Sequence, residues 1–222
     1  LMLAALNGHN ETVQSLLANG AKTNTQSKSG TTALMAASLK GNRPMVQLLL
    51  ENGANINAQS KDQWTALMMA ASNSHNETVQ SLLANGAKTD TQSKDQWTAL
   101  IIAAGNGHNE TVQSLLANGA KIDTQHGKSG GTALIIAAQN GHTDTVQLLL
   151  ANGANIDAQN KWCETALIIA ANSGHNDTVQ SLLANGANIE AQNINGTTAL
   201  MLAASNSHNE TVQSLLANGA KI

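Results

Sequence analysis

Residues 65–87 read Thr-Ala-Leu-Met-Met-Ala-Ala-Ser-Asn-Ser-His-Asn-Glu-Thr-Val-Gln-Ser-Leu-Leu-Ala-Asn-Gly-Ala, and variants of this stretch fill the 222-residue chain. Its Thr-Ala-Leu start recurs at Thr32, Thr65, Thr98, Thr132, Thr165 and Thr198, and its Asn-Gly-Ala end recurs seven times between Asn19 and Asn218. The spacing of the starts is 33 residues, except for 34 between Thr98 and Thr132. A period of this length indicates a repeat architecture, because so short a unit cannot bury its apolar face alone and must stack on its neighbours.

Within one repeat, the apolar spacing predicts two short helices. Residues 65–72 place Leu67 and the small alanines at helical spacing, with Thr65 as the N-cap. A break at residues 73–75 leads to a second helix over residues 76–84, which Asn-Gly ends because glycine tolerates the left-handed backbone of a C-cap. The polar, turn-rich residues 87–97 are predicted to form a projecting hairpin. We call this segment, and its equivalent in each repeat, a finger.

A 33-residue repeat of helix, turn, helix and finger resembles the ankyrin repeat, and the resemblance covers essentially the whole chain. The family pattern of Thr-Pro-Leu-His, an apolar residue, Ala-Ala, Gly-His, Val, Leu-Leu, Gly-Ala and Asn-Ala is matched by Thr132 to Ala138, Gly141-His142, Val146, Leu149-Leu150, Gly153-Ala154 and Asp157-Ala158. This resemblance implies an all-α solenoid of ankyrin-like helix-turn-helix-hairpin repeats. It implies one domain over residues 1–222 with seven units, approximately 1–26, 27–59, 60–92, 93–125, 126–159, 160–192 and 193–222.

Two positions depart from the family pattern in every repeat. Alanine replaces the proline, as at Ala133, and Met or Ile replaces the first histidine, as at Ile135. Losing that histidine removes a polar link, so we expect stability to depend more on aliphatic packing. In addition, the finger over residues 126–131 carries one extra residue and three glycines, and we expect it to be longer and more mobile than its neighbours.

The two ends of the chain are atypical for a solenoid. Residues 1–3 are apolar and open inside a first helix, and residues 220–222 follow directly on a second helix, so neither end has a polar capping repeat. Two interpretations stay open at this point. The chain is a piece of a longer array, or its uncapped ends stack on other copies in a head-to-tail self-association that builds a filament.

Composition and charge exclude several classes of partner. Charged residues make up 11% of the chain and the net charge is -3, so the sequence has no basic stripe for nucleic acid and no polybasic membrane anchor. The longest apolar runs, such as residues 133–138, are too short to span a bilayer. We therefore expect neither a nucleic-acid nor a membrane partner. A cytoplasmic location is the default expectation, and secretion stays open.

The chemistry-bearing side chains do not form a catalytic or metal-binding pattern. Six histidines occur one per repeat, so they lie about 10 Å apart, too far to share a zinc ion whose ligands stand about 2 Å from the metal. They are His9, His75, His108, His142, His175 and His208. The resemblance implies that they brace the loop between helices. His126 stands outside this register, and the single Cys163 has no partner base that the sequence identifies. We predict no enzyme, no metal site and no cofactor.

The three tryptophans are the only aromatic residues, and all of them fall in fingers. The resemblance implies that fingers and the exposed side of the first helices form a concave recognition face, and Trp is enriched at interface hot spots. The predicted partner-binding residues are Trp64, Trp97 and Trp162, with Lys61, Asp62, Lys94 and Asp95 as polar surroundings. Leu6 and Leu39 would extend the face, because other repeats carry Ser, Gly, Gln or Asn there. The alternative is that each Trp lies flat on the neighbouring finger and covers backbone.

Asn-X-Thr sequons recur at the start of the second helix. They lie at Asn10, Asn76, Asn109, Asn176 and Asn209, with another at Asn195 in a finger. Glycosylation at these asparagines would need a secretory route. The competing interpretation is that each asparagine caps its helix while the following acidic residue complements the helix N-terminus.

Together these features predict a non-enzymatic protein–protein interaction module or scaffold. It would hold a protein partner of unknown identity against its fingers and the exposed face of its first helices. The alternative function is a self-assembling structural fibre or spacer formed by stacking of the uncapped ends.

Overall fold

The computed structural model describes residues 1–222, and its regular structure is helical. The helices are α1 (Met2–Leu6), α2 (Asn10–Ala18), α3 (Ala33–Leu39), α4 (Arg43–Glu51), α5 (Ala66–Ser72), α6 (Asn76–Ala84), α7 (Ala99–Gly105), α8 (Asn109–Ala117), α9 (Ala133–Gln139), α10 (Thr143–Ala151), α11 (Ala166–Ser173), α12 (Asn176–Ala184), α13 (Ala199–Ser205) and α14 (Asn209–Ala217). The predicted order of helix, turn, helix and finger is confirmed. The one isolated β-bridge, between Gln192 and Thr198, closes the base of a finger.

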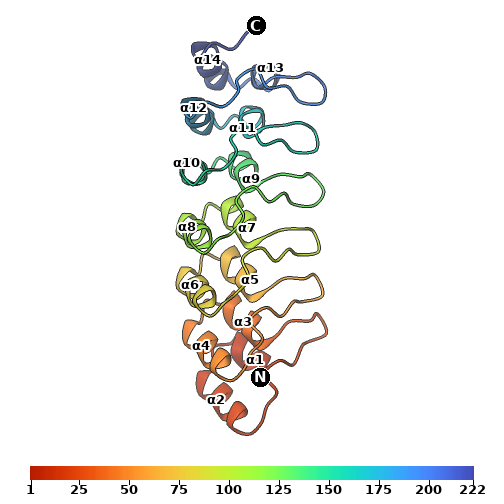
Figure 1. Ribbon diagram of the computed structural model, residues 1–222, viewed down its shortest axis with the longest axis vertical. Coiled ribbons are helices and arrows are strands. Elements are labelled where there is room, and N and C mark those ends of the chain that lie inside the picture. Colours follow the sequence, from red (N-terminus) through yellow and green to blue (C-terminus); the bar gives the residue numbers. More distant parts are fainter. The chain divides into compact units, whose positions relative to one another are not determined.

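Contacts group the chain into two compact units. Unit 1 contains residues 1–103 and 110–120, and unit 2 contains residues 104–109 and 121–222. In unit 1, the first helices α1, α3 and α5 pack in one layer and the second helices α2, α4 and α6 pack in another (Figure 1). In unit 2, α9, α11 and α13 form the first layer and α10, α12 and α14 form the second. Within each unit the fingers project beyond the layer of first helices, away from the second helices. The boundaries of the repeats and their grouping in a single domain stay predictions.

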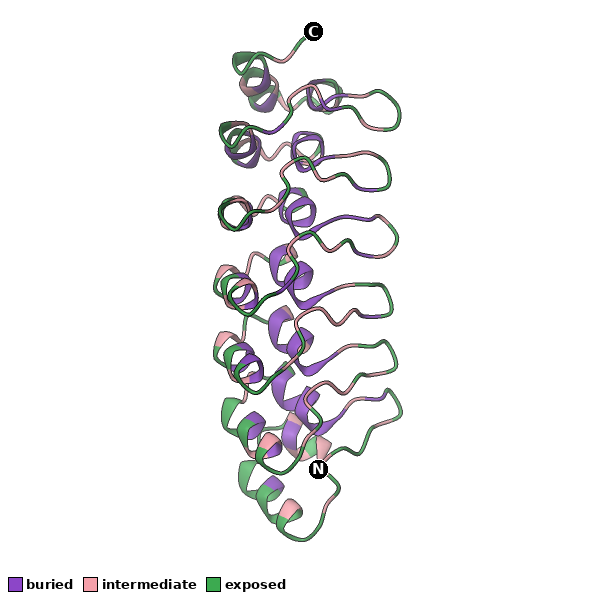
Figure 2. Ribbon diagram, viewed as in Figure 1, coloured by how far each residue is buried: buried purple, intermediate pink, exposed green.

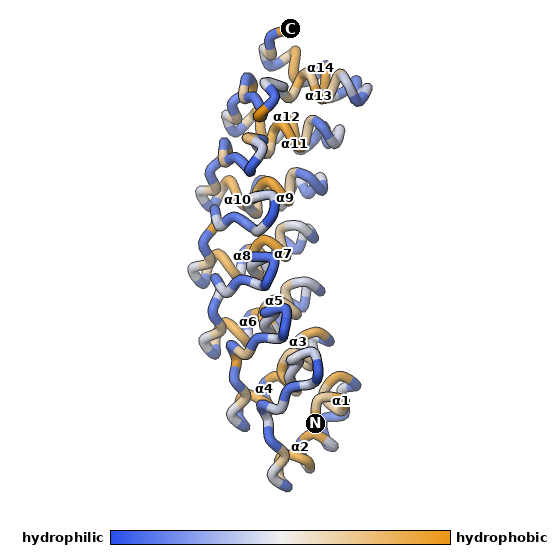
Figure 3. The backbone as a smooth tube through the Cα atoms, turned by 90° about the vertical axis from the view of Figure 1, so that its right-hand side faces the viewer, coloured by the Kyte–Doolittle hydropathy of each residue, from blue (hydrophilic) through white to orange (hydrophobic).

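The first helices are the core of each repeat. All of them except α1 begin at the predicted threonine cap: Thr65 Oγ1 accepts a hydrogen bond from Met68 N at 3.3 Å, and Thr132 accepts one from Ile135 N. Figure 2 shows α3, α5, α9 and α11 mostly buried and α1 and α13 partly exposed, and Figure 3 shows the apolar character concentrated in helices and the polar character in fingers. Ile135 and Ile168 are at most 1% exposed, which agrees with the expected aliphatic packing in place of the family's histidine.

The second helices begin differently from the sequence-based expectation. The N-cap of α6 is His75, without a side-chain cap, and Asn76 is the first helical residue. The Asn76 side chain therefore bonds to the next repeat instead of its own helix: its Oδ1 accepts a hydrogen bond from Thr111 Oγ1. The prediction that the sequon asparagines cap these helices is wrong, because histidine occupies the cap position. Only Asn42, in a repeat without a histidine there, caps in the expected way, by accepting from Met45 N at 3.1 Å.

The histidine at that cap position braces the preceding repeat. In unit 2, His175 Nε2 lies 3.0 Å from the backbone oxygen of Gln139, at the end of α9, and the ring packs against Gly141. His208 makes the equivalent contact with the backbone oxygen of Asn172. The expected structural role is thus confirmed for these histidines, and their hydrogen bond joins two repeats as well as ordering a loop.

Candidate functional site

Each finger ends in a tight turn that positions the predicted binding residues. In the finger that carries Trp64, Gln63 N donates to Ser60 O at 2.9 Å and Ser60 N donates to Trp64 O at 2.9 Å. Gln63 takes a left-handed backbone with φ of 61°. This is the three-residue hairpin loop in which a type I turn precedes a left-handed residue. The turn leaves the side chains of Lys61 and Asp62 exposed at the tip.

Neighbouring finger tips are joined by backbone hydrogen bonds. In unit 1, Lys61 N donates to Ser29 O and Lys94 N donates to Asp62 O, both at 2.9 Å. In unit 2, Lys161 N donates to Ser129 O at 2.8 Å and Ile194 N donates to Trp162 O at 2.8 Å. The tips within a unit therefore present a fixed row of side chains instead of independent loops. Lys94 and Asp95 are exposed in that row.

The three tryptophans differ in how far they are available to a partner. Trp64 and Trp97 are half-buried on the returning segment of their fingers. Trp162 lies at a tip and is 49% exposed, and Ile194 on the adjoining tip is 65% exposed. Trp64 and Trp97 belong to unit 1, whereas Trp162 belongs to unit 2. The structure describes two separate groups of candidate anchors.

An apolar groove in unit 1 lies between the first helices and the finger of residues 27–31. It has a volume of about 440 Å³ and is lined mainly by apolar side chains from α1, α3 and α5. The lining residues include Leu6, Met35, Ala36, Leu39, Met69 and Lys28. Leu39 is 37% exposed at the rim. Leu6 and Leu39, which were predicted to extend the face, both line this groove, and sequence reasoning missed a third lining residue, Ala36.

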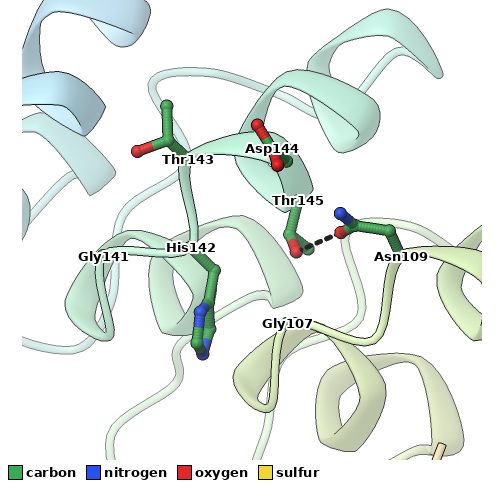
Figure 4. A pocket seen from close by; sticks show the side chains of 7 residues that line it. All are labelled: Gly107, Asn109, Gly141, His142, Thr143, Asp144 and Thr145. Carbon is green, nitrogen blue, oxygen red and sulfur yellow. Dashed lines mark hydrogen bonds between the residues drawn. The ribbon is translucent and has the colours of Figure 1, made fainter.

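A polar pocket of about 290 Å³ lies in unit 2 beside the start of α10 (Figure 4). His142 and Asp144 line it, and Thr145 Oγ1 donates to Asn109 Oδ1. His142 Nε2 lies 3.1 Å from the backbone oxygen of Gly105. The side chains of this pocket join successive repeats. No three His, Cys, Asp or Glu side chains are grouped so that they could hold a metal ion.

The sequon residues are part of the same contacts between repeats. The sequon threonines Thr78, Thr178 and Thr211 are at most 1% exposed. Asn76 Nδ2, the atom that would carry a glycan, donates to Glu110. A glycan on this atom would replace that hydrogen bond between neighbouring second helices. Asn195 lies instead at an exposed finger tip. Glycosylation at Asn10, Asn76, Asn109, Asn176 and Asn209 stays a prediction.

The long finger of unit 2 is closed by a buried histidine. His126 is 9% exposed, and its Nε2 lies 2.8 Å from Ser129 Oγ. Lys161 crosses from the next finger and donates through Nζ to Gly127 O at 2.8 Å. Burial, and secondly the positive charge of Lys161, lower the pKa of His126 below its usual 6.5. The imidazole is therefore held neutral. The expected greater mobility of this finger stays a prediction.

A pH dependence of stability follows from His126. Because its pKa is lower in the folded protein, the unfolded chain takes up a proton first as the pH falls. The free energy of unfolding therefore has its full value, as far as His126 is concerned, above pH 6.5. It decreases as the pH falls from there toward the folded-state pKa of His126. We expect urea midpoints to drop more between pH 7.5 and pH 5.5 in the wild type than in His126→Gln. Equal drops in the two proteins would contradict this account of the finger.

Two further observations concern membrane-spanning helices and the single cysteine. None of the helices combines the length and the apolar character that crossing a membrane requires. Cys163 is a free thiol, half-buried at the left-handed position of its finger tip, with φ of 59°.

Comparison with known proteins agrees with the geometry. The family profile of ankyrin repeats (3 copies) matches residues 1–93, 75–160 and 152–222. The chain therefore belongs to the ankyrin repeat family, and the resemblance found in the sequence is confirmed. The crystal structure of the human ASB11 ankyrin repeat domain is similar, with 31% identity and a TM-score of 0.89 over 100% of this chain and 98% of that one. No match was found among the curated proteins. Ankyrin repeats generally serve as protein–protein interaction modules and are typically non-enzymatic.

Proposed function

We propose that this protein is a non-enzymatic binding module that holds a protein partner against its fingers and the exposed side of its first helices. The observation that carries the proposal is the apolar groove of unit 1, because it lies on this face and is open to solvent. Apolar concave surface of this kind is a typical ligand or partner site. On the side of the second helices, the pocket between α6 and α8 has polar side chains in its lining, among them Gln80, Gln113 and Asn118.

The finger residues complete the proposed surface. Leu39, Trp64 and Trp97 are the apolar contacts in unit 1, and Lys61, Asp62, Lys94 and Asp95 are their polar surroundings. Trp162 is a separate contact in unit 2, beside Ile194. Trp provides a large contact area at low entropic cost, and half-buried indoles need little further ordering on binding. The backbone bonds between tips support this, since a preorganised face loses less conformational freedom when a partner binds.

The test selects peptides from a random display library on the full chain and measures their affinities by fluorescence anisotropy. We expect the triple variant Leu39→Ser, Trp64→Ala, Trp97→Ala to weaken binding at least tenfold while circular dichroism stays that of the wild type. The matched control removes three exposed side chains of the second helices, Gln14→Ala, Gln47→Ala, Gln80→Ala. Equal affinities in the two variants would reject the proposed face, and so would a library that yields no binding peptide.

Self-association is the second candidate function. Met201 is 51% exposed, although its equivalents Ile135 and Ile168 are buried by the following repeat. Leu3 is 67% exposed in the first repeat. Stacking of a second copy would cover such side chains. Sedimentation velocity over a hundredfold range of concentration tests this, because a stacking protein shifts to larger species and a monomeric binding module does not.

A further inference from the structure

One position in the array has a small residue in repeat 2 alone. The fourth residue of the helix α3 is Ala36. At the equivalent position, the other repeats carry large aliphatic residues, namely Leu3, Met69, Ile102, Ile136, Ile169 and Leu202. Ala36 lines the apolar groove. Ala36 is 2% exposed, so at this position the groove is lined by a buried side chain that is smaller than its equivalents in the other repeats.

A second departure surrounds the same place. Leu6 and Leu39 line the groove at a position where later repeats carry Ser72, Gly105, Gln139, Asn172 and Ser205. The lining of the groove thus combines the small Ala36 with two large apolar residues, Leu6 and Leu39. Met35 and Met69 complete the lining, and methionine side chains adapt to ligands of varied shape. Both departures favour binding of a bulky apolar side chain in this repeat.

The charge around the groove has one sign. Lys28 is the one charged residue that lines it. Lys40 follows Leu39 directly, and Lys61 lies on the neighbouring tip, which is bonded to Ser29. Residues 1–61 contain five basic and two acidic residues, a net charge of +3, whereas residues 62–222 contain six basic and twelve acidic residues, a net charge of -6. Both acidic residues of the first segment, Glu11 and Glu51, lie on second helices.

We propose that the groove above Ala36 binds an acidic peptide segment of the protein partner, with a bulky apolar side chain as its anchor. The aliphatic or aromatic anchor enters between Leu6, Leu39 and Met69. A neighbouring Asp or Glu of the partner lies against Lys28, with Lys40 and Lys61 adding attraction; Asp62 is the acidic side chain on the adjoining tip. This inference rests on the proposed function and names the chemistry of the partner for that same face.

The experiment uses two synthetic pools of 12-residue peptides and the full chain. Both pools have Leu, Ile, Met or Phe at the central positions, and one has Asp and Glu in the flanks where the other has Lys and Arg. We expect the acidic pool to bind at least tenfold more tightly by fluorescence anisotropy, because the one charged side chain that lines the anchor site is the cation of Lys28. Equal binding of the two pools would overturn the proposed charge complementarity.

Two variants test the groove itself. Ala36→Ile installs the residue that Ile102, Ile136 and Ile169 provide in other repeats, and circular dichroism of the variant checks that the fold is kept while the groove is filled. We expect it to weaken binding of the acidic pool at least tenfold. Lys28→Glu should weaken the acidic pool several-fold and strengthen the basic pool. The control is Lys88→Glu, which makes the same change of net charge at an exposed lysine of unit 1 that does not line the groove and has no role in the proposed surface.

The outcomes separate this inference from the proposed function. If Ala36→Ile binds the acidic pool as tightly as the wild type, the groove is not the anchor site and the inference is wrong. If Lys28→Glu and Lys88→Glu have the same effect, the recognition of charge is not local and the inference is also wrong. In either case, library-selected peptides that still respond to the Leu39, Trp64 and Trp97 triple variant would leave the proposed function standing.

Discussion

Gly141→Ala is expected to destabilise unit 2 by about 3 kcal/mol, because alanine at this position has both a backbone and a steric penalty. Gly141 has φ of +72°, and a Cβ built on it would lie 2.7 Å from Nδ1 of His175. The imidazole would have to move, and its 3.0 Å hydrogen bond to the backbone oxygen of Gln139 would be lost. That bond and the ring packing join two successive repeats.

Gly153→Ala is the matched control for this prediction. Gly153 has φ of +86°, but a Cβ there would meet nothing within 4 Å. Only the left-handed backbone then opposes alanine, and the lower entropy of the unfolded alanine chain offsets part of it, so we expect a loss of about 1 kcal/mol or less. Urea unfolding followed by circular dichroism measures both. Similar losses in the two variants would show that the contact between histidine and glycine contributes nothing.

Ile168→Ala is expected to cost about 3 kcal/mol, since it leaves a cavity in the packed layer of first helices. Ile168 is fully buried at the position where the family pattern has histidine. Its neighbour Ile169 is half-exposed. Ile169→Ala removes the same atoms and should cost about 1 kcal/mol, because water can occupy part of the vacated space.

The comparison of these two variants tests which face of α11 packs inward. Hydrogen exchange of the α9 and α11 amides measures the effect locally, because stability in a repeat array depends on each repeat and its neighbours. Equal changes in protection for Ile168→Ala and Ile169→Ala would contradict the described register of this helix.

The sequence predicted the repeats and their helices because the signals are local. The threonine cap of Thr65, the apolar spacing after it and the Asn-Gly end of the next helix each act within one repeat, and each was found where it was expected. The role of the histidines was also predictable in kind. Their partners were not, because the carbonyl that His175 contacts lies 36 residues away in the chain.

The candidate site was predicted less completely, since it depends on contacts between repeats. Trp64 was expected to be an exposed anchor, but it is half-buried, which depends on packing between segments that the sequence of one repeat does not determine. In the sequence, the only sign of the groove was Ala36, an alanine at a repeat position where the other repeats carry large aliphatic residues. Ala36 carries no chemistry of its own, so a search for chemical motifs passes over it. The sequon asparagines show the same limit, because Asn76 bonds to the next repeat instead of its own helix.

Hydrogen–deuterium exchange of the full chain with and without a selected peptide tests the account most directly. The account predicts that the peptide slows exchange in residues 27–39 and 60–69, which are the finger tips and first helices around the groove. Protection confined to the second helices α2, α4 and α6, with residues 27–39 unchanged, would contradict it.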